Sequence, residues 1–268
     1  MKTFLTIDMI SVTLSRKRIL PIILLIITTI SCDSENANDC LQTDGDTITY
    51  EEIVPAFSRI QLENDIQVIL KEGPEQEVLI ETGENLVPDL TIKVEQETLI
   101  LQNNNGCNFL REFGKTIVRV TSPNITFIRQ ASSFPIVSDG ILSYPNLTIW
   151  SNTNPNSLNI DDPNKSGRVT LELNTNALSI QANGSSNFTL SGTSNTANIV
   201  FSDEFPQMNA RDLIVQDITI RHVSAAQIVV HPINSISGQI RATGDVIAVN
   251  IPTTVDVETF FTGELIFE

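Results

Sequence analysis

Four short segments decide the fold of this 268-residue chain: ALSIQA (177–182), ANIVFS (197–202), DITIRH (217–222) and SGQIRA (237–242). Within them, the branched residues Ile180, Val200, Ile220 and Ile240 recur at every twentieth position. A fixed period of this length in short β-type segments is typical of a solenoid, because stacked coils bury apolar faces that a single coil leaves exposed. We therefore expect these four side chains to lie in one buried column.

The same spacing extends toward the N-terminus with one interruption. Ile149 follows Ile128 after an interval of nearly the same length, whereas the interval from Ile149 to Ile180 is longer by about half. The longer interval indicates one coil that carries an insertion near 161–165.

Upstream of residue 116 the strands read as longer and alternate cleanly. Ile66, Val68 and Leu70 share one face, and the turn 71–74 follows them. Together these patterns predict an all-β protein, specifically a right-handed parallel β-helix with coils of ~20 residues. A β-sandwich is the alternative, because its short alternating strands give a similar pattern.

The bulk composition is that of an ordinary globular chain, 41% hydrophobic and 18% charged. The formal net charge is −16. Binding to nucleic acid requires clustered Lys and Arg, so this acidic balance argues against a nucleic-acid partner.

The N-terminus has the layout of a secretory signal. A basic block at 16–18 precedes the apolar run 19–30, and Ser31 and Cys32 follow. This run is shorter than the ~20 residues that span a bilayer. The segment Thr29-Ile30-Ser31-Cys32 resembles a bacterial lipobox, which implies that Cys32 is lipidated. An ordinary signal peptide with a chance cysteine is the alternative, and either Met1 or Met9 can be the start.

These features divide the chain into three parts. We expect a lipoprotein signal peptide at 1–31, an acidic flexible tether at 32–46 and one β-helix domain at 47–268. Within that domain, 47–115 forms a longer-stranded part and 116–268 forms the repeated coils.

Two further cysteines, Cys40 and Cys107, remain if Cys32 carries lipid. A pair of cysteines in an exported protein indicates a disulfide. Two free thiols are the alternative. Neither residue has a second Cys or His at zinc-ligand spacing, so we expect no metal site there.

Several segments occur in the order seen in one known family. They are 57–60 (FSRI), 68–73 (VILKEG), 78–86 (VLIETGENL), 99–101 (LIL), 118–125 (VRVTSPNI) and 182–186 (ANGSS). On these residues the chain resembles the head GIN domain family of auto-transporter adhesin-like proteins, over roughly 53 to 250. The resemblance implies a right-handed β-helix on a lipoprotein or secreted protein whose biochemical role is unassigned.

No catalytic motif is present in the sequence. His222 and His231 have no metal-binding spacing, and there is no P-loop, G-x-S-x-G or dinucleotide fingerprint. The acidic pairs 161–162 and 203–204 and the residue Asp212 do not align on one face. We therefore expect no catalytic residue, cofactor or metal. An extracellular carbohydrate-active enzyme on a β-helix, which needs two opposed carboxylates, is the alternative.

Trp150 is the single tryptophan and a candidate ligand contact. It follows Ile149, which reads as buried, so alternation directs its ring outward. Cover of the ring by the insertion at 161–165 is the alternative. We predict a non-catalytic binding or adhesion-type scaffold in the cell envelope, anchored in the outer membrane through lipid on Cys32. Its expected partner is an extracellular glycan or protein. The sequence leaves open the ligand, the side of the membrane and the oligomeric state.

Overall fold

The computed structural model describes residues 39–109, 112–151 and 166–268. Of these, 63% lie in strands and 4% in helices, so the all-β prediction is confirmed. The strands join into one sheet. Its members are β1 (Thr47–Glu51), β2 (Arg59–Asn64), β3 (Ile66–Glu72), β4 (Glu77–Gly83), β5 (Leu90–Glu95), β6 (Thr98–Asn103), β7 (Thr116–Ser122), β8 (Phe127–Ser132), β9 (Ile136–Leu142), β10 (Asn146–Ser151), β11 (Arg168–Ala182), β12 (Asn187–Phe201), β13 (Gln207–His222), β14 (Ile228–Ile240), β15 (Val246–Ala248), β16 (Thr254–Thr259) and β17 (Leu265–Phe267). The two 3-10 helices are η1 (Asp39–Leu41) and η2 (Glu84–Asp89).

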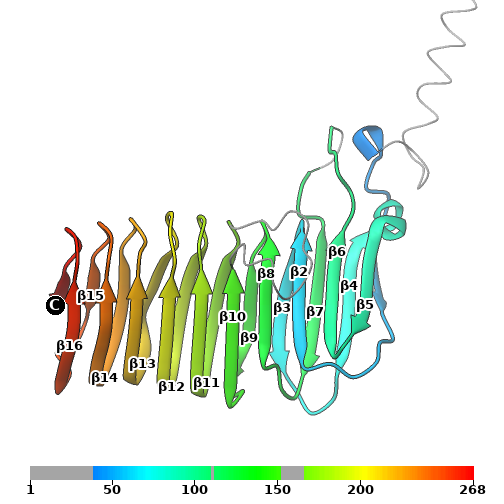
Figure 1. Cartoon of the computed structure of the whole chain (residues 1–268). Helices are drawn as coiled ribbons and strands as arrows, with labels where there is room; N and C mark the ends of the chain where they lie inside the picture. Colours follow the sequence, from blue (N-terminus) through cyan, green and yellow to red (C-terminus); the bar gives the residue numbers. More distant parts are fainter. Residues whose placement is uncertain (1–38, 110–111, 152–165) are drawn as a thin grey trace, which may run out of the picture.

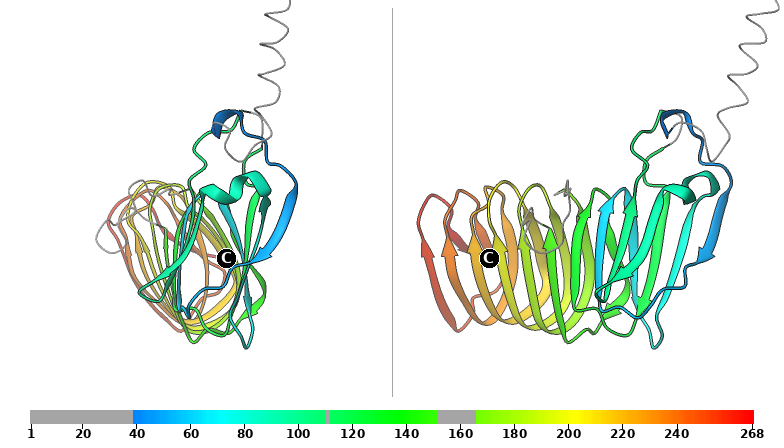
Figure 2. Two further views of the ribbon diagram at one scale, coloured as in Figure 1. Left: turned by 90° about the vertical axis from the view of Figure 1, so that its right-hand side faces the viewer. Right: turned by 45° about the vertical axis from the view of Figure 1, so that its right-hand side comes forward.

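The sheet is curled, and its strands follow one another along the long axis of the molecule (Figure 1). Strands β6, β2, β8, β10, the second halves of β11 to β14, and β16 pair side by side and form what we call the front wall. Strands β7, β3, β9, the first halves of β11 to β14, β15 and β17 form the rear wall. Seen from the end, the two walls enclose the core (Figure 2).

The predicted column of four branched residues is wrong in its register. Ile180 pairs with Ile199, which pairs with Ile220, which pairs with Gly238. The residue numbers therefore advance in unequal steps, and only the average step is close to the predicted period. Irregularities in the pairing of β12 with β13 and of β13 with β14 absorb the difference.

The other two members of the predicted column lie elsewhere. Val200 is half-buried and pairs with Gln181 and Arg221, so it belongs to an outward row. Ile240 is fully buried but pairs with His222, in another row further along the strand. A period counted in sequence cannot detect these shifts, because bulges change the number of residues per step without ending a strand.

The N-terminal part does not simply precede the later strands. β2 lies between β6 and β8 in the front wall, and β3 lies between β7 and β9 in the rear wall. The strands β2 and β3, which come early in the sequence, are therefore flanked on both sides by strands that come later in the sequence. Antiparallel strands finish this end: β5 pairs with β6, β4 with β7 and β1 with β4.

The core runs between the two walls. Inward-facing residues are almost completely shielded from solvent and include Ile60, Ile128, Ile149 and Ile180 of the front wall. β-branched side chains suit this position because they pack well on a pleated surface. One small void of about 10 Å³ lies between the walls at β11 to β14 and is lined by side chains such as Ile180, Ile199 and Val215.

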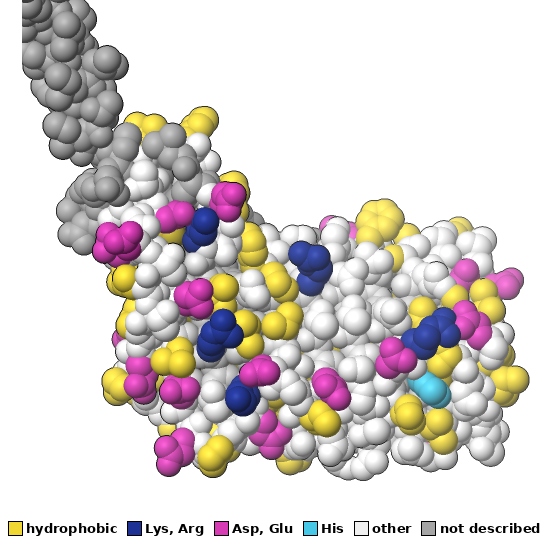
Figure 3. Space-filling model, turned by 180° about the vertical axis from the view of Figure 1, so that it is seen from behind, with side chains coloured by type: hydrophobic (Ala, Val, Ile, Leu, Met, Phe, Trp, Pro, Cys, Tyr) yellow, Lys and Arg dark blue, Asp and Glu magenta, His cyan; other side chains and the backbone are white. Residues whose placement is uncertain are grey.

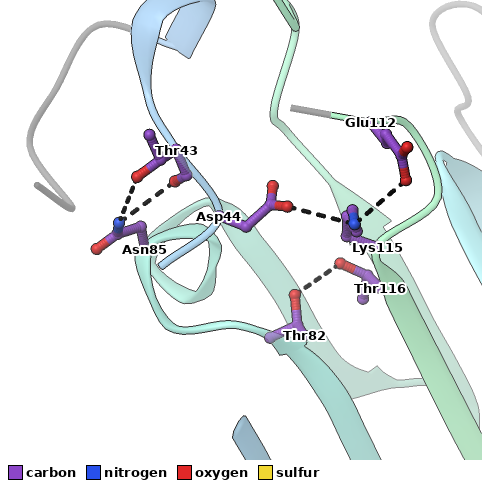
Figure 4. A network of polar contacts seen from close by, with 7 residues as sticks. All are labelled: Thr43, Asp44, Thr82, Asn85, Glu112, Lys115 and Thr116. Atoms are coloured by element: carbon purple, nitrogen blue, oxygen red, sulfur yellow. Dashed lines mark hydrogen bonds and ion pairs between the residues drawn. The ribbon is translucent and has the colours of Figure 1, made fainter. Parts of the chain in front are cut away.

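Polar contacts join η2 and the start of β7 to the segment before β1, and β4 to β7 (Figure 4). Asn85 Nδ2 donates to the Thr43 carbonyl at 3.3 Å, and the Thr82 and Thr116 hydroxyls lie 2.9 Å apart. The Lys115 ammonium lies 3.5 Å from Asp44. A hydrogen bond to Glu112 and the charge of Asp44 raise the pKa of Lys115. These contacts fix the end of the sheet where the parallel pairing stops.

Candidate binding groove

Two rows of short polar side chains cross the outward side of the front wall between β10 and β13. Side chains two residues apart on a strand point to the same side. The registers place equivalent residues of neighbouring strands beside one another, so each row follows the long axis of the stack. One row comprises Asn146, Ala177, Thr196 and Asp217, and the other comprises Thr148, Ser179, Asn198 and Thr219.

These rows line an open groove of about 290 Å³. The buried side chains of Leu147, Leu178 and Ala197 lie beneath it. Asp217 is the one ionisable residue among those that line the groove, and its carboxylate accepts a hydrogen bond from the Ser235 hydroxyl at 2.6 Å. The groove therefore presents hydroxyl and amide groups together with apolar surface, and it carries little charge.

Part of this hydrogen-bonding capacity is unused within the protein. The side chains of Thr148, Ser179 and Asn198 make no hydrogen bond to any other residue that the structure describes. They sit on three successive strands at the centre of the groove. Their donors and acceptors are consequently available to a ligand.

The backbone under the groove is held by a ladder of side chains at the bend between the two walls. The Thr193 hydroxyl donates to Asn174 Oδ1 at 3.0 Å, and Asn195 Nδ2 donates to Asn176 Oδ1 at 2.8 Å. These two contacts join β11 to β12 at the bend next to the groove.

An aromatic pair stands at the β8 end of the groove. Phe127 is the register partner of Thr148, and its ring lies 5.2 Å from that of Trp150 in an edge-to-face arrangement. Such pairs contribute about 0.5–1.5 kcal/mol beyond their burial. The Arg59 guanidinium covers the Phe127 ring at 4.5 Å. Trp150 is half-buried, and its indole nitrogen has no hydrogen-bond partner among the described residues.

The rear wall has a different character (Figure 3). Opposite charges pair across its strands: Lys71 with Asp139 at 3.8 Å, Arg119 with Glu81 at 3.6 Å and Arg211 with Glu268 at 2.6 Å. Exposed pairs of this type stabilise a fold by little, about 0–1 kcal/mol each.

The two histidines take structural positions. His222 is 1% exposed, and its Nε2 lies 2.9 Å from the Ala226 carbonyl. Burial lowers the pKa of His222, which favours the neutral ring. His231 Nδ1 lies 2.8 Å from the Arg211 carbonyl on the rear wall. The structure does not bring the two rings together.

The acidic candidates also stay apart. Asp203 and Glu204 follow the end of β12, whereas Asp212 lies on the rear-wall half of β13. The pair 161–162 lies outside the described residues. Among the residues that the structure does describe, no group of three His, Cys, Asp or Glu side chains is placed to hold a metal ion.

Cys40 and Cys107 form a disulfide in the structure, with their Cα atoms 4.6 Å apart. It links the segment containing η1 to the loop after β6. The signal segment, Cys32 and the start of the tether lie outside the described residues. Within the described ranges, no helix has the length and apolar character needed to cross a membrane.

Sequence reasoning singled out Trp150 but not the groove beside it. The missing signal was the Asn, Ser and Thr content at the outward positions of 146–148, 177–179 and 196–198. Those positions become neighbours only through the registers of β10 with β11 and of β11 with β12. The sequence spacing placed Ile149 beside Ile180 correctly, whereas the even period misplaces β12 against β11 by one position. The Phe127–Trp150 contact depends in the same way on the pairing of β8 with β10.

The family comparison agrees with the resemblance drawn from the sequence. Residues 56–252 match the family described as "Putative auto-transporter adhesin, head GIN domain". A comparison with curated proteins finds no match.

Solved structures share the fold at low sequence identity. A "putative adhesin" from Bacteroides fragilis NCTC 9343 is 19% identical with a TM-score of 0.72, over 83% of this chain and 97% of that one. A "putative adhesin" from Parabacteroides merdae ATCC 43184 is 16% identical, with a TM-score of 0.56 over 84% and 97%. A "putative lipid binding protein" from Parabacteroides distasonis ATCC 8503 is 14% identical, with a TM-score of 0.56 over 83% and 97%.

Proposed function

This chain belongs to the head GIN domain family, and we propose that it is a non-catalytic binding scaffold displayed on the cell envelope. The observation that carries the proposal is the groove on the front wall. Its hydroxyl and amide groups that make no hydrogen bond to the described residues can bind a partner.

The fold proposed for this function is a right-handed parallel β-helix that occupies 47–268. Parallel pairing of successive strands at nearly constant steps along the chain supports it. The right hand follows from the general preference of parallel crossovers. A long stack of this kind gives a stiff support that carries a binding face away from its anchor.

Anchoring through Cys32 completes the proposal. The signal at 1–31 directs export, lipid on Cys32 holds the protein at the outer membrane, and the tether 32–46 separates the domain from the bilayer. Each buried methylene of an acyl chain contributes about 0.8 kcal/mol, and two or more chains are needed for stable attachment. Replacing Cys32 by Ala in the full chain should abolish incorporation of labelled palmitate and move the protein from the detergent-rich to the aqueous phase. Unchanged phase partitioning would contradict lipid anchoring.

Lipid as the bound partner has little support from the interior. One structural neighbour is described as lipid-binding. In this chain the void described between the walls at β11 to β14 has a volume of about 10 Å³, close to the volume that one water needs. We therefore place binding on the surface rather than in the core.

The binding function is tested with the mature chain, fluorescently labelled and carrying Cys32→Ser so that no lipid contributes. We expect retention on at least one member of a panel of glycans, extracellular proteins and whole bacterial cells. A strain lacking the gene should lose the same interaction. Retention on no panel member, with an unchanged deletion strain, would refute the binding proposal.

A further inference from the structure

We propose that the groove between β10 and β13 binds a linear, uncharged glycan whose chain lies along the axis of the stack. This inference rests on the proposed binding function and names its ligand class. Neighbouring strands are about 4.8 Å apart, so the groove presents similar polar groups at that repeat. The sugar rings of an extended glycan recur at a comparable distance. A glycan crossing the strands therefore meets one polar side chain, such as Ser179 or Asn198, at each step.

The charge of the groove selects a neutral glycan over an acidic one. No Lys or Arg lines the groove, and its one ionisable side chain, Asp217, is an acid. The whole chain has a net charge of −16. A polyanionic ligand would meet like charge without any basic partner, which is unfavourable.

A peptide strand is a poorer fit than a glycan. Strands β11 and β12 beneath the groove are hydrogen-bonded on both sides, so their backbones cannot accept an added strand. The large exposed hydrophobic side chains of the described residues lie outside the groove, and they include Phe205, Ile214 and Ile251. Protein interfaces usually rely on such apolar anchors.

The aromatic pair supplies the remaining element of a glycan site. Trp150 and Phe127 stand where the second row meets β8. The indole nitrogen of Trp150 is shielded from solvent, so this half-buried side chain can offer a sugar only the apolar surface of its ring. We assign Trp150 as the contact for the sugar ring at this end of the groove.

The test compares two matched double variants of the mature chain. Ser179→Ala with Asn198→Ala removes two groove side chains that are register partners on β11 and β12. Thr170→Ala with Thr189→Ala removes two exposed register partners from the same strands on the rear wall. Binding is measured by calorimetry against neutral linear hexasaccharides of glucose, xylose, mannose and galactose, and against polygalacturonate as the anionic probe.

We expect at least one neutral hexasaccharide to bind the unmodified protein. The groove variant should weaken that binding by roughly 10-fold or more, as the loss of two hydrogen bonds implies, whereas the rear-wall variant should change it by less than about 2-fold. Trp150→Ala should also weaken it, with a circular dichroism spectrum matching that of the unmodified protein.

Three outcomes would overturn the inference. Binding of polygalacturonate alone would reverse the charge argument, and equal losses in the two double variants would place the site elsewhere. Binding of a protein but of no saccharide would refute the glycan while leaving the proposed scaffold function intact. Failure of the scaffold function itself is distinguished by retention on no member of the broader panel.

Discussion

Gly238→Ala is the sharpest test of the stacked arrangement. Gly238 has a φ of +123°, and a Cβ built on it lies 1.9 Å from the carbonyl oxygen of Ile220. These two residues are register partners in successive strands of the front wall. The obstacle is backbone, so no side-chain rotation can relieve the contact. The two strands must move apart until this distance of 1.9 Å reaches the 3.4 Å at which ordinary van der Waals contact begins.

A matched control separates this contact from backbone strain. Gly140 has a φ of +88°, and a Cβ there meets nothing within 4 Å. Both substitutions place alanine at a positive φ, which lowers the stability of the folded state by about 1–2 kcal/mol. Both also reduce the conformational entropy of the unfolded chain, which offsets about 0.4–1 kcal/mol of that loss. Overpacking adds about 1–3 kcal/mol at Gly238 alone. We expect Gly238→Ala to lower the free energy of unfolding by about 2 kcal/mol more than Gly140→Ala does.

The assay is equilibrium unfolding of the mature chain in urea, followed by far-ultraviolet circular dichroism with the disulfide intact. The difference should appear as a lower midpoint for Gly238→Ala at an unchanged m value. Equal midpoints for the two variants would refute the reasoning, because they would show that nothing lies directly above Gly238.

Three further outcomes are expected from the same assay. Replacing Cys40 and Cys107 together by Ala should lower the unfolding free energy by roughly 2–4 kcal/mol, because the disulfide closes a loop with a sequence separation of 67 and so restricts the unfolded chain. An unchanged urea midpoint, or two titratable thiols in the native protein, would contradict the disulfide. Burial lowers the pKa of His222, so the unfolded state takes up its proton first as pH falls below about 6.5. The stability present above that pH is then lost on acidification, and His222→Leu should flatten this dependence of the unfolding free energy on pH. An unchanged pH dependence in that variant would argue against a buried neutral ring. Tyr144→Phe should cost about 0.5–1.5 kcal/mol, because its hydroxyl donates to the Ser122 carbonyl at 3.2 Å, and a gain in stability would show that this bond is not formed.

Local patterns were sufficient for the class of fold. Alternation of Ile66, Val68 and Leu70 predicted a strand with one buried face, and all three are fully buried in β3. The order of short segments along the chain was sufficient for the family, and residues 56–252 match it. Each of these inferences depends on neighbours within a few residues, which is the range over which β geometry repeats.

The register of the strands, and which strands lie side by side, were decided only by the tertiary structure. Ile180 lies on Ile199 rather than Val200, because the number of residues that each step consumes varies along the stack. β2 pairs with both β6 and β8, and no local sequence pattern predicts this pairing. The groove depends on the first of these effects, because Ser179 and Asn198 become neighbours only in the register that pairs β11 with β12. The sequence by itself determined that this chain forms strands with one apolar face, since alternation is local. Which polar side chains meet on the other face was settled by long-range pairing, whose free energy is shared among many residues far apart in the chain.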